Sequence, residues 1–161
     1  MFPRVSTETF PQAVSGLMVA FIQGLRSRPS PGSALLDEKP WNDPVSENPT
    51  FGTTEVWSFL NLTVDSHPIH LHAVHFRVLD RQAFDADRYN RSKEVIPLGP
   101  QRLPEPWEMG PKDTVCAHPN EITRILVRFE SFPGRFVWHC HMLEHEDFEM
   151  MRPYTVLGTP N

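Results

Sequence analysis

Six of the eight histidines in this chain fall into two short clusters. The first cluster is the motif HPIHLH over residues 67–72, and the second is HCHMLEH over residues 139–145, which also contains a cysteine. Imidazole and thiolate groups are common protein ligands of transition metals, and short tracts rich in them are typical of metal sites. The clustering therefore predicts that the two segments bind metal ions together.

The spacing within each cluster divides the candidate ligands between two sites. Residues two positions apart on a strand point to the same face, and direct neighbours point to opposite faces. If the clusters lie on paired strands, one face carries four imidazoles and the other carries a cysteine and a histidine, with two more ligands on the loop that follows. The predicted sets are His70, His72, His139 and His141 on one face, and His67, Cys140, His145 and Met150 on the other.

The donor atoms on the cysteine side favour copper over zinc. Two imidazoles, one thiolate and one thioether form the ligand set of blue-copper electron-transfer sites. The four-imidazole side has no thiolate and is typical of part of a site where copper meets dioxygen. Cys140 is covalently bonded between His139 and His141, so it offers a short through-bond route between the two sites. A structural zinc site and incidental histidines are the alternatives, and the joint occurrence of both motifs argues against each.

Other reactive side chains have simpler interpretations. The acidic run inside and after the second cluster favours a solvated turn, although a carboxylate beside a copper centre could also relay protons. His75 and His118 lie outside the metal spacing and are expected to be partly buried polar residues. Cys116 is interpreted as a buried free thiol. The triplet NLT that begins at Asn61 matches a glycosylation acceptor, but it lies in a predicted strand and is set aside.

Length and composition limit the remaining functions. The chain has 161 residues, enough for about one domain, and its 39% apolar and 22% charged residues indicate a folded globular protein. Seventeen prolines argue against an all-helical bundle. A net charge of −5 without a Lys/Arg block predicts no nucleic-acid partner. The most apolar stretch, residues 16–25, is shorter than the ~20 residues of a membrane span, so no membrane partner is predicted either.

The β-rich part of the chain must position the two clusters. Alternating runs bounded by turn residues predict strands of a sandwich at residues 54–62, 73–79, 113–117, 122–129, 135–140 and 154–157. The proline-rich residues 98–111 predict an irregular loop. Apolar residues at helical spacing predict a short helix over residues 12–26, and the breaker-rich residues after it predict a linker. We therefore expect an N-terminal extension over residues 1–49 and a compact domain over residues 50–161.

These motifs resemble the C-terminal cupredoxin domain of multicopper oxidases, most closely the bacterial spore-coat laccase and bilirubin oxidase group. The similar blocks are HPIHLH at residues 67–72, FRVLD at 76–80, KDT at 112–114 and HCHMLEHEDFEMMRP at 139–153. The resemblance implies an all-β fold, a Greek-key cupredoxin β-sandwich, here with the short N-terminal helix and linker. It is also compatible with an extracytoplasmic or spore-coat location.

The resemblance implies a role for each candidate ligand. The type 1 copper would be bound by His67, Cys140, His145 and axial Met150. The type 2 copper would be bound by His70. The type 3 copper pair would be bound by His72, His139 and His141. Glu146 matches an acidic residue that is implicated in proton delivery in the spore-coat group. Cys140 and Glu146 are therefore the expected catalytic residues.

Members of this family oxidise phenols, aromatic amines or metal ions by single electrons and reduce dioxygen to water. Their trinuclear copper cluster takes four further histidines from two His-x-His motifs in an N-terminal domain, and this sequence has neither. We therefore expect the C-terminal part of a laccase-like oxidase that needs an N-terminal cupredoxin domain or a partner chain. The alternative is a single-domain blue copper protein that carries electrons or binds copper, although such a carrier needs only the Cys140 set.

Overall fold

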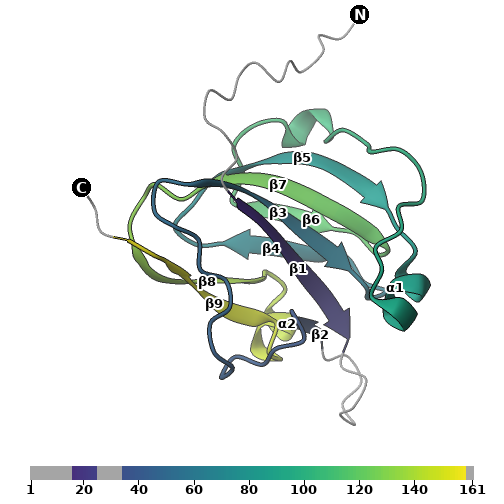
Figure 1. Ribbon diagram of the computed structural model, residues 1–161, viewed down its shortest axis with the longest axis horizontal. Coiled ribbons are helices and arrows are strands. Elements are labelled where there is room, and N and C mark those ends of the chain that lie inside the picture. The colour runs from purple at the N-terminus through teal and green to yellow at the C-terminus, as the bar shows by residue number, and fades with distance from the viewer. Residues whose placement is uncertain (1–15, 25–33, 159–161) are drawn as a thin grey trace, which may run out of the picture.

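The computed structural model of the chain describes residues 16–24 and 34–158, which form two facing β-sheets (Figure 1). One sheet has the strand order β2-β1-β3-β7-β5, and the other has the order β6-β4-β8-β9. Paired strands are antiparallel, except β1 and β3, which are parallel. The strands are β1 Gly16–Gly24, β2 Ala34–Leu36, β3 Thr54–Asn61, β4 His67–Leu71, β5 Phe76–Ala83, β6 Thr114–Ala117, β7 Glu121–Arg128, β8 Gly134–Cys140 and β9 Met151–Val156. The helices are α1 Ala86–Ser92, α2 Leu143–Asp147 and a 3-10 turn at Pro106–Glu108.

Aromatic side chains fill the space between the sheets. Trp57 of β3 contacts Trp138 of β8 and Tyr154 of β9, with ring centroids 6.1 and 5.9 Å apart. All three residues are completely buried. Large aromatic rings bury more apolar area than any other side chains, and edge-to-face pairs such as these add a specific geometry. The core therefore fixes β8 and β9, the strands that lie on either side of the second histidine cluster.

Strand β1 corrects the helix predicted over residues 12–26. Residues 16–24 form a strand whose backbone pairs in parallel with β3, from Gly16 opposite Glu55 to Ile22 opposite Asn61. The apolar run over residues 17–22 is continuous, so it also satisfies the helical spacing, and periodicity alone cannot separate a buried strand from a short helix. The other residues of the predicted helix lie outside the described residues. Strands β1 and β2 also belong to the five-stranded sheet, although the sequence analysis placed them in the extension.

The remaining element predictions are borne out in most positions. The runs at 54–62, 122–129 and 135–140 agree with β3, β7 and β8 to within one residue. The run predicted at 73–79 begins three residues too early, because the chain turns at Ala73, which has a left-handed φ of 64°. Helix α1 was not predicted, although Asp85 caps it by accepting a hydrogen bond from the backbone N–H of Arg88 at 2.7 Å.

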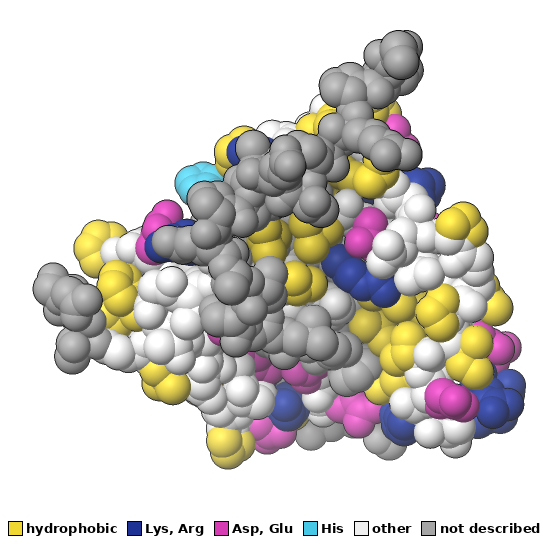
Figure 2. All heavy atoms as spheres, turned by 45° about the horizontal axis from the view of Figure 1, so that its top comes forward, with side chains coloured by type: hydrophobic (Ala, Val, Ile, Leu, Met, Phe, Trp, Pro, Cys, Tyr) yellow, Lys and Arg dark blue, Asp and Glu magenta, His cyan; other side chains and the backbone are white. Residues whose placement is uncertain are grey.

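The proline-rich loop between α1 and β6 is irregular apart from its 3-10 turn, as predicted. Buried Arg81 anchors this turn by donating to both carboxylate oxygens of Glu108, at 2.7 and 2.6 Å. The loop exposes the large apolar side chains of Leu98, Leu103, Trp107 and Met109. On the face drawn in Figure 2, hydrophobic side chains alternate with both acidic and basic ones. Among the helices that the structure describes, none is long and apolar enough to cross a membrane.

Candidate metal centres

The two histidine clusters lie on the paired strands β4 and β8. The register places His70 opposite His139 and Ile69 opposite Cys140. Because successive side chains of a strand point to opposite faces, the first pair lies on the outer face of the sheet and the second pair faces the core. Ile69 and Cys140 are accordingly completely buried. The strand pairing that the sequence analysis presupposed is therefore present.

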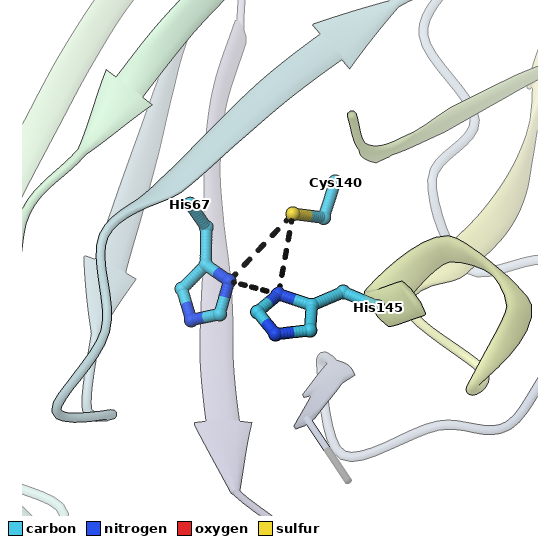
Figure 3. A group of neighbouring side chains, drawn as sticks. All are labelled: His67, Cys140 and His145. Atoms are coloured by element: carbon cyan, nitrogen blue, oxygen red, sulfur yellow. Dashed lines mark hydrogen bonds between the residues drawn. The ribbon is translucent and has the colours of Figure 1, made fainter. Parts of the chain in front are cut away.

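Three ligand atoms converge on the core side of this strand pair (Figure 3). The Nδ1 atoms of His67 and His145 lie 3.6 and 3.7 Å from the Sγ atom of Cys140, and 3.2 Å from each other. A point equidistant from these three atoms lies about 2 Å from each, which is the bond length of nitrogen and sulfur ligands to a transition metal. The three side chains therefore fit one metal ion without rearrangement.

Three different elements supply these ligands. His67 begins β4, Cys140 ends β8 and His145 lies in the single turn of α2. The chain then returns to the site, since the backbone N–H of Met150 donates to the carbonyl of His145, and the N–H of Cys140 donates to the carbonyl of Met150, each at 3.0 Å. Met150 is completely buried. The backbone thus holds the fourth predicted ligand directly beside two of the others.

The ring of His67 is oriented by a neighbouring hydroxyl group. Its Nε2 atom lies 2.7 Å from Oγ1 of Thr63, which leaves Nδ1 directed at Cys140. Outer partners of this kind fix the ring orientation of metal-binding histidines. Thr63 belongs to the NLT triplet, whose Asn61 is completely buried and donates its amide hydrogens to the carbonyls of Asp65 and Ala117. The triplet therefore supports the His67 side of the site, and its asparagine is not accessible for glycosylation.

Burial sets the protonation of this site. Burial, together with the neighbouring His145, lowers the pKa of His67 from 6.5 to about 4. Burial raises the pKa of the Cys140 thiol above its ordinary value. At neutral pH, His67 is therefore neutral and has a free lone pair, whereas Cys140 holds its proton until a cation replaces it.

The outer face of the same strands brings four imidazoles together. The ring centroids of neighbouring pairs are between 4.9 and 5.4 Å apart. The Nε2 atoms of His72 and His139 are 3.1 Å apart, and His70 can direct a ring nitrogen to within 4.8 Å of theirs. His141 completes the group through its ring contacts with His70 and His139.

Two of these rings have outer hydrogen-bond acceptors. Nδ1 of His70 donates to the carbonyl oxygen of Asp113 at 2.9 Å. Nδ1 of His139 lies 3.0 Å from the carbonyl oxygen of Cys140 and 3.2 Å from Oε2 of Glu146. Contacts at Nδ1 leave Nε2 available to a metal ion. Partial burial also lowers the pKa of His70 and His72, which favours the neutral, metal-binding form.

Glu146 contacts the outer site, which its sequence position next to His145 did not indicate. It lies in α2, a helix of a single turn, directly after His145. The side chain of His145 lies with His67 and Cys140, whereas that of Glu146 lies with His139 and His141. Its half-buried carboxylate forms a possible ligand group with His139 and His141. The acidic run alone does not distinguish this contact from an exposed turn, and the resemblance to the spore-coat group is the sequence signal that singled out Glu146.

The four-imidazole face borders an open pocket of about 460 Å³. Its lining includes His70, His72, Asp113 and Phe132. His75, which was predicted to be partly buried, is exposed and also lines this pocket. The pocket gives small molecules access to the outer face.

Cys116 and His118 lie together on and just after β6, the strand that pairs with β4. His118 is half-buried, as predicted, and its Nδ1 lies 3.0 Å from Oγ of Ser66. Cys116 is a free thiol, as predicted, but it is half-buried and not fully buried, because strand β6 lies at the edge of its sheet. Its Sγ atom is 3.8 Å from the same Nδ1.

Comparison with known proteins identifies similar sequences. The sequence profile of multicopper oxidases matches residues 14–159. The chain is 49% identical over 155 residues to a laccase from Bacillus subtilis (strain 168), which covers 96% of this chain and 29% of that protein. It is 53% identical over 123 residues to a laccase from Bacillus stratosphericus, which covers 76% of this chain and 24% of that protein. The chain thus spans 24% to 29% of the length of these relatives.

Solved structures share the same arrangement of sheets. A multi-copper oxidase from Pediococcus acidilactici matches with a TM-score of 0.67 and 28% identity, over 90% of this chain and 26% of that chain. The McoA multicopper oxidase from Aquifex aeolicus matches with a TM-score of 0.69 and 24% identity, over 92% of this chain and 31% of that chain. Together with the two described sheets, these matches confirm the predicted cupredoxin β-sandwich.

Proposed function

The chain belongs to the multicopper oxidase family, and on that premise we propose that it forms the copper-binding C-terminal part of a laccase-like oxidase. In the proposed reaction a small reductant, such as a phenol, an aromatic amine or a metal ion, loses single electrons, and dioxygen is reduced to water. One observation carries the proposal: two different donor sets lie on opposite faces of the same pair of strands.

The buried set suits a type 1 copper. His67, Cys140 and His145 would hold the metal through two Nδ1 atoms and one thiolate, and Met150 would supply a thioether. Bound copper would supply the one-electron oxidation of the reductant and the reduction of dioxygen. The protein keeps the imidazole of His67 neutral, holds the thiolate in place and excludes water from the sulfur, because Cys140 is completely buried.

The outer set suits one half of a trinuclear copper cluster. His70 would bind the type 2 copper, and His72, His139 and His141 would bind the type 3 pair. The support is that His70 and His139 have their Nδ1 atoms hydrogen-bonded, so that each presents Nε2 to the open side. The two sets are joined through Cys140, whose backbone is bonded directly to the neighbouring histidines on either side.

Glu146 is the proposed proton donor for dioxygen reduction. The formation of water consumes protons, so a titratable group must lie between solvent and the outer set. The carboxylate of Glu146 meets this requirement, because it is partly exposed and its Oε2 lies 3.2 Å from Nδ1 of His139. Its role is to take up a proton from solvent and pass it toward the outer face.

The proposal includes a second domain or chain that supplies the other ligands. Four imidazoles are too few for three copper ions, and the face that carries them is open to solvent. The chain also spans less than a third of the length of its laccase relatives. A protein that only carries electrons would need the Cys140 set, but it would not need the four imidazoles on the outer face.

The test combines copper loading with oxygen uptake. The purified chain, loaded with copper, is expected to develop the intense thiolate-to-copper absorption of a type 1 site and to consume no oxygen with a phenolic reductant. Addition of a protein that carries the two missing His-x-His motifs is expected to start oxygen uptake. A chain that binds copper without this absorption would overturn the type 1 assignment, and oxygen uptake by the chain alone would overturn the need for a partner.

A further inference from the structure

Residues 40–44, with the sequence PWNDP, lie against the part of the chain that carries two of the candidate copper ligands. Figure 1 shows the blue segment after β2 running beside β9 and α2. The sequence analysis placed these residues in a linker. Two side chains, Arg152 and Glu149, hold them in place.

Arg152 forms the inner attachment of the 40–44 segment. Its side chain is completely buried, and its guanidinium donates to the carbonyl oxygens of Pro40 at 2.6 Å, Asp43 at 3.1 Å and Pro44 at 2.7 Å. Burial of a guanidinium costs free energy unless its N–H groups are hydrogen-bonded, and these bonds satisfy the two terminal nitrogens of Arg152, whereas its Nε has no partner. Because proline fixes φ, the two prolines restrict the directions of these carbonyls. The segment and Arg152 therefore stabilise each other in one arrangement.

Glu149 forms the outer attachment. Its Oε2 atom accepts a hydrogen bond from the backbone N–H of Trp41 at 2.7 Å. The backbone of Glu149 has a φ of 74°, a left-handed conformation that residues with a Cβ rarely adopt. Glu149 immediately precedes Met150, so the hydrogen bond to Trp41 secures the turn that brings Met150 to the site.

The position of Met150 depends on both attachments. Its backbone lies between Glu149 and the first residue of β9, and Arg152 follows two residues later. Through its own N–H and carbonyl, Met150 is hydrogen-bonded to His145 and Cys140, each at 3.0 Å. A shift of residues 149–152 would therefore move the axial ligand and, through these two bonds, the loop that carries His145.

We propose that Arg152 and Glu149 are positioning residues for the copper ligands, and that the 40–44 segment is the part of the chain against which they fix Met150 and His145. The inference rests on the proposed function, because it presupposes copper at Cys140. A purely structural role would change only the stability of the fold. A positioning role also changes the copper affinity and the absorption of the copper–thiolate bond, because the axial thioether tunes that site.

The test compares two substitutions of the same side chain in the full chain. Glu149→Ala removes the acceptor for Trp41, whereas Glu149→Gln keeps an oxygen acceptor and removes only the charge. We expect Glu149→Ala to weaken copper(I) binding about tenfold, the lower end for loss of an outer partner, and to shift the absorption band of the oxidised site. Glu149→Gln is expected to retain the wild-type affinity and band. Glu144→Ala, an exposed acidic residue of α2, is the matched control.

Arg152→Lys provides a second variant, since an ammonium group cannot reach carbonyls on several residues as the planar guanidinium does. It is expected to shift the band at least as far as Glu149→Ala, and the half-buried Glu149 variants keep the test decisive if Arg152→Lys does not fold.

If wild type lacks the band, the proposed function fails. If wild type has the band and Glu149→Ala leaves affinity and band unchanged, the positioning role is overturned. It is also overturned if Glu149→Gln matches Glu149→Ala, since charge would then be the cause.

Discussion

The hydroxyl group of Tyr154 donates a hydrogen bond to the backbone carbonyl of His72. Tyr154 belongs to the buried aromatic cluster, where it contacts Trp57 and Phe129, whereas the side chain of His72 is exposed on the outer face. Burial raises the pKa of Tyr154, so the hydroxyl keeps its proton at any physiological pH. The core of the sandwich thus fixes the backbone of a histidine that points away from it.

Tyr154→Phe tests the strength of this link. The substitution keeps the aromatic ring but leaves the carbonyl of His72 without its donor. Loss of one partner of a buried hydrogen bond typically costs about 1–3 kcal/mol, so we expect a decrease of that size in the free energy of unfolding. Urea denaturation of the metal-free chain measures it. An unchanged free energy would mean that solvent reaches this carbonyl.

Cys140→Ser is expected to abolish the thiolate-to-copper absorption of the copper-loaded chain, because a hydroxyl group does not provide a thiolate ligand. Cys116→Ser is the matched control, since Cys116 is the other free cysteine and lies opposite Pro68 in the strand register, on the other face of the sheet from His67. Visible absorption and copper content of the two variants give the comparison. Loss of the band in Cys116→Ser as well would reject the assignment of the metal to Cys140 alone.

Glu146→Gln is expected to slow dioxygen reduction in the assembled oxidase by about 10²-fold or more, because an amide cannot supply a proton. Reduction of the copper at Cys140 by the substrate should be unaffected. Glu144→Gln removes a charge from the same short helix and serves as the control. Stopped-flow absorption and oxygen uptake separate the two steps, and equal oxygen uptake by both variants would remove Glu146 from the mechanism.

The stability of the metal-free chain is expected to fall as the pH drops from 6.5 to 4. In this range an unfolded chain protonates His67, whose ordinary pKa is 6.5, whereas the folded chain resists protonation until about pH 4. The free energy of unfolding should therefore decrease by about 1.4 kcal/mol per pH unit from this residue. Urea denaturation at pH 7 and pH 5 measures the slope. His67→Gln should flatten it, and an unchanged slope in that variant would contradict the assignment to His67.

The division of the candidate ligands between two faces was predictable because it depends only on alternation, once the two strands are taken to pair. The order His-x-His around Cys140 assigns faces to each residue before any tertiary contact is known, and the register of His70 with His139 agrees with that assignment. The run that became β7 was equally clear, since buried and half-buried positions alternate along most of it, whereas β3 is buried at each of its last five positions. Such local patterns can be recognised from the sequence alone.

The features that sequence reasoning missed depend on contacts between distant segments. Strand β1 forms beside β3, and the continuous apolar run over residues 17–22 does not specify that pairing. Arg152 reads as a surface charge in the sequence, because its acceptors are backbone carbonyls more than a hundred residues away. Glu146 was expected from the resemblance, but its contact with His139 was not, because that contact forms through the turn of α2.

The register of β4 and β8 also limits how this protein can vary in length. Because His70 lies opposite His139 and Ile69 lies opposite Cys140, inserting or deleting one residue in either strand would reverse the face of every ligand beyond that point. A single insertion or deletion would therefore disrupt both donor sets, even if it lay next to only one of them. Length changes in homologous or recombined proteins are therefore confined to the connecting loops, and a graft of either centre into another sandwich has to transfer the two strands as a unit.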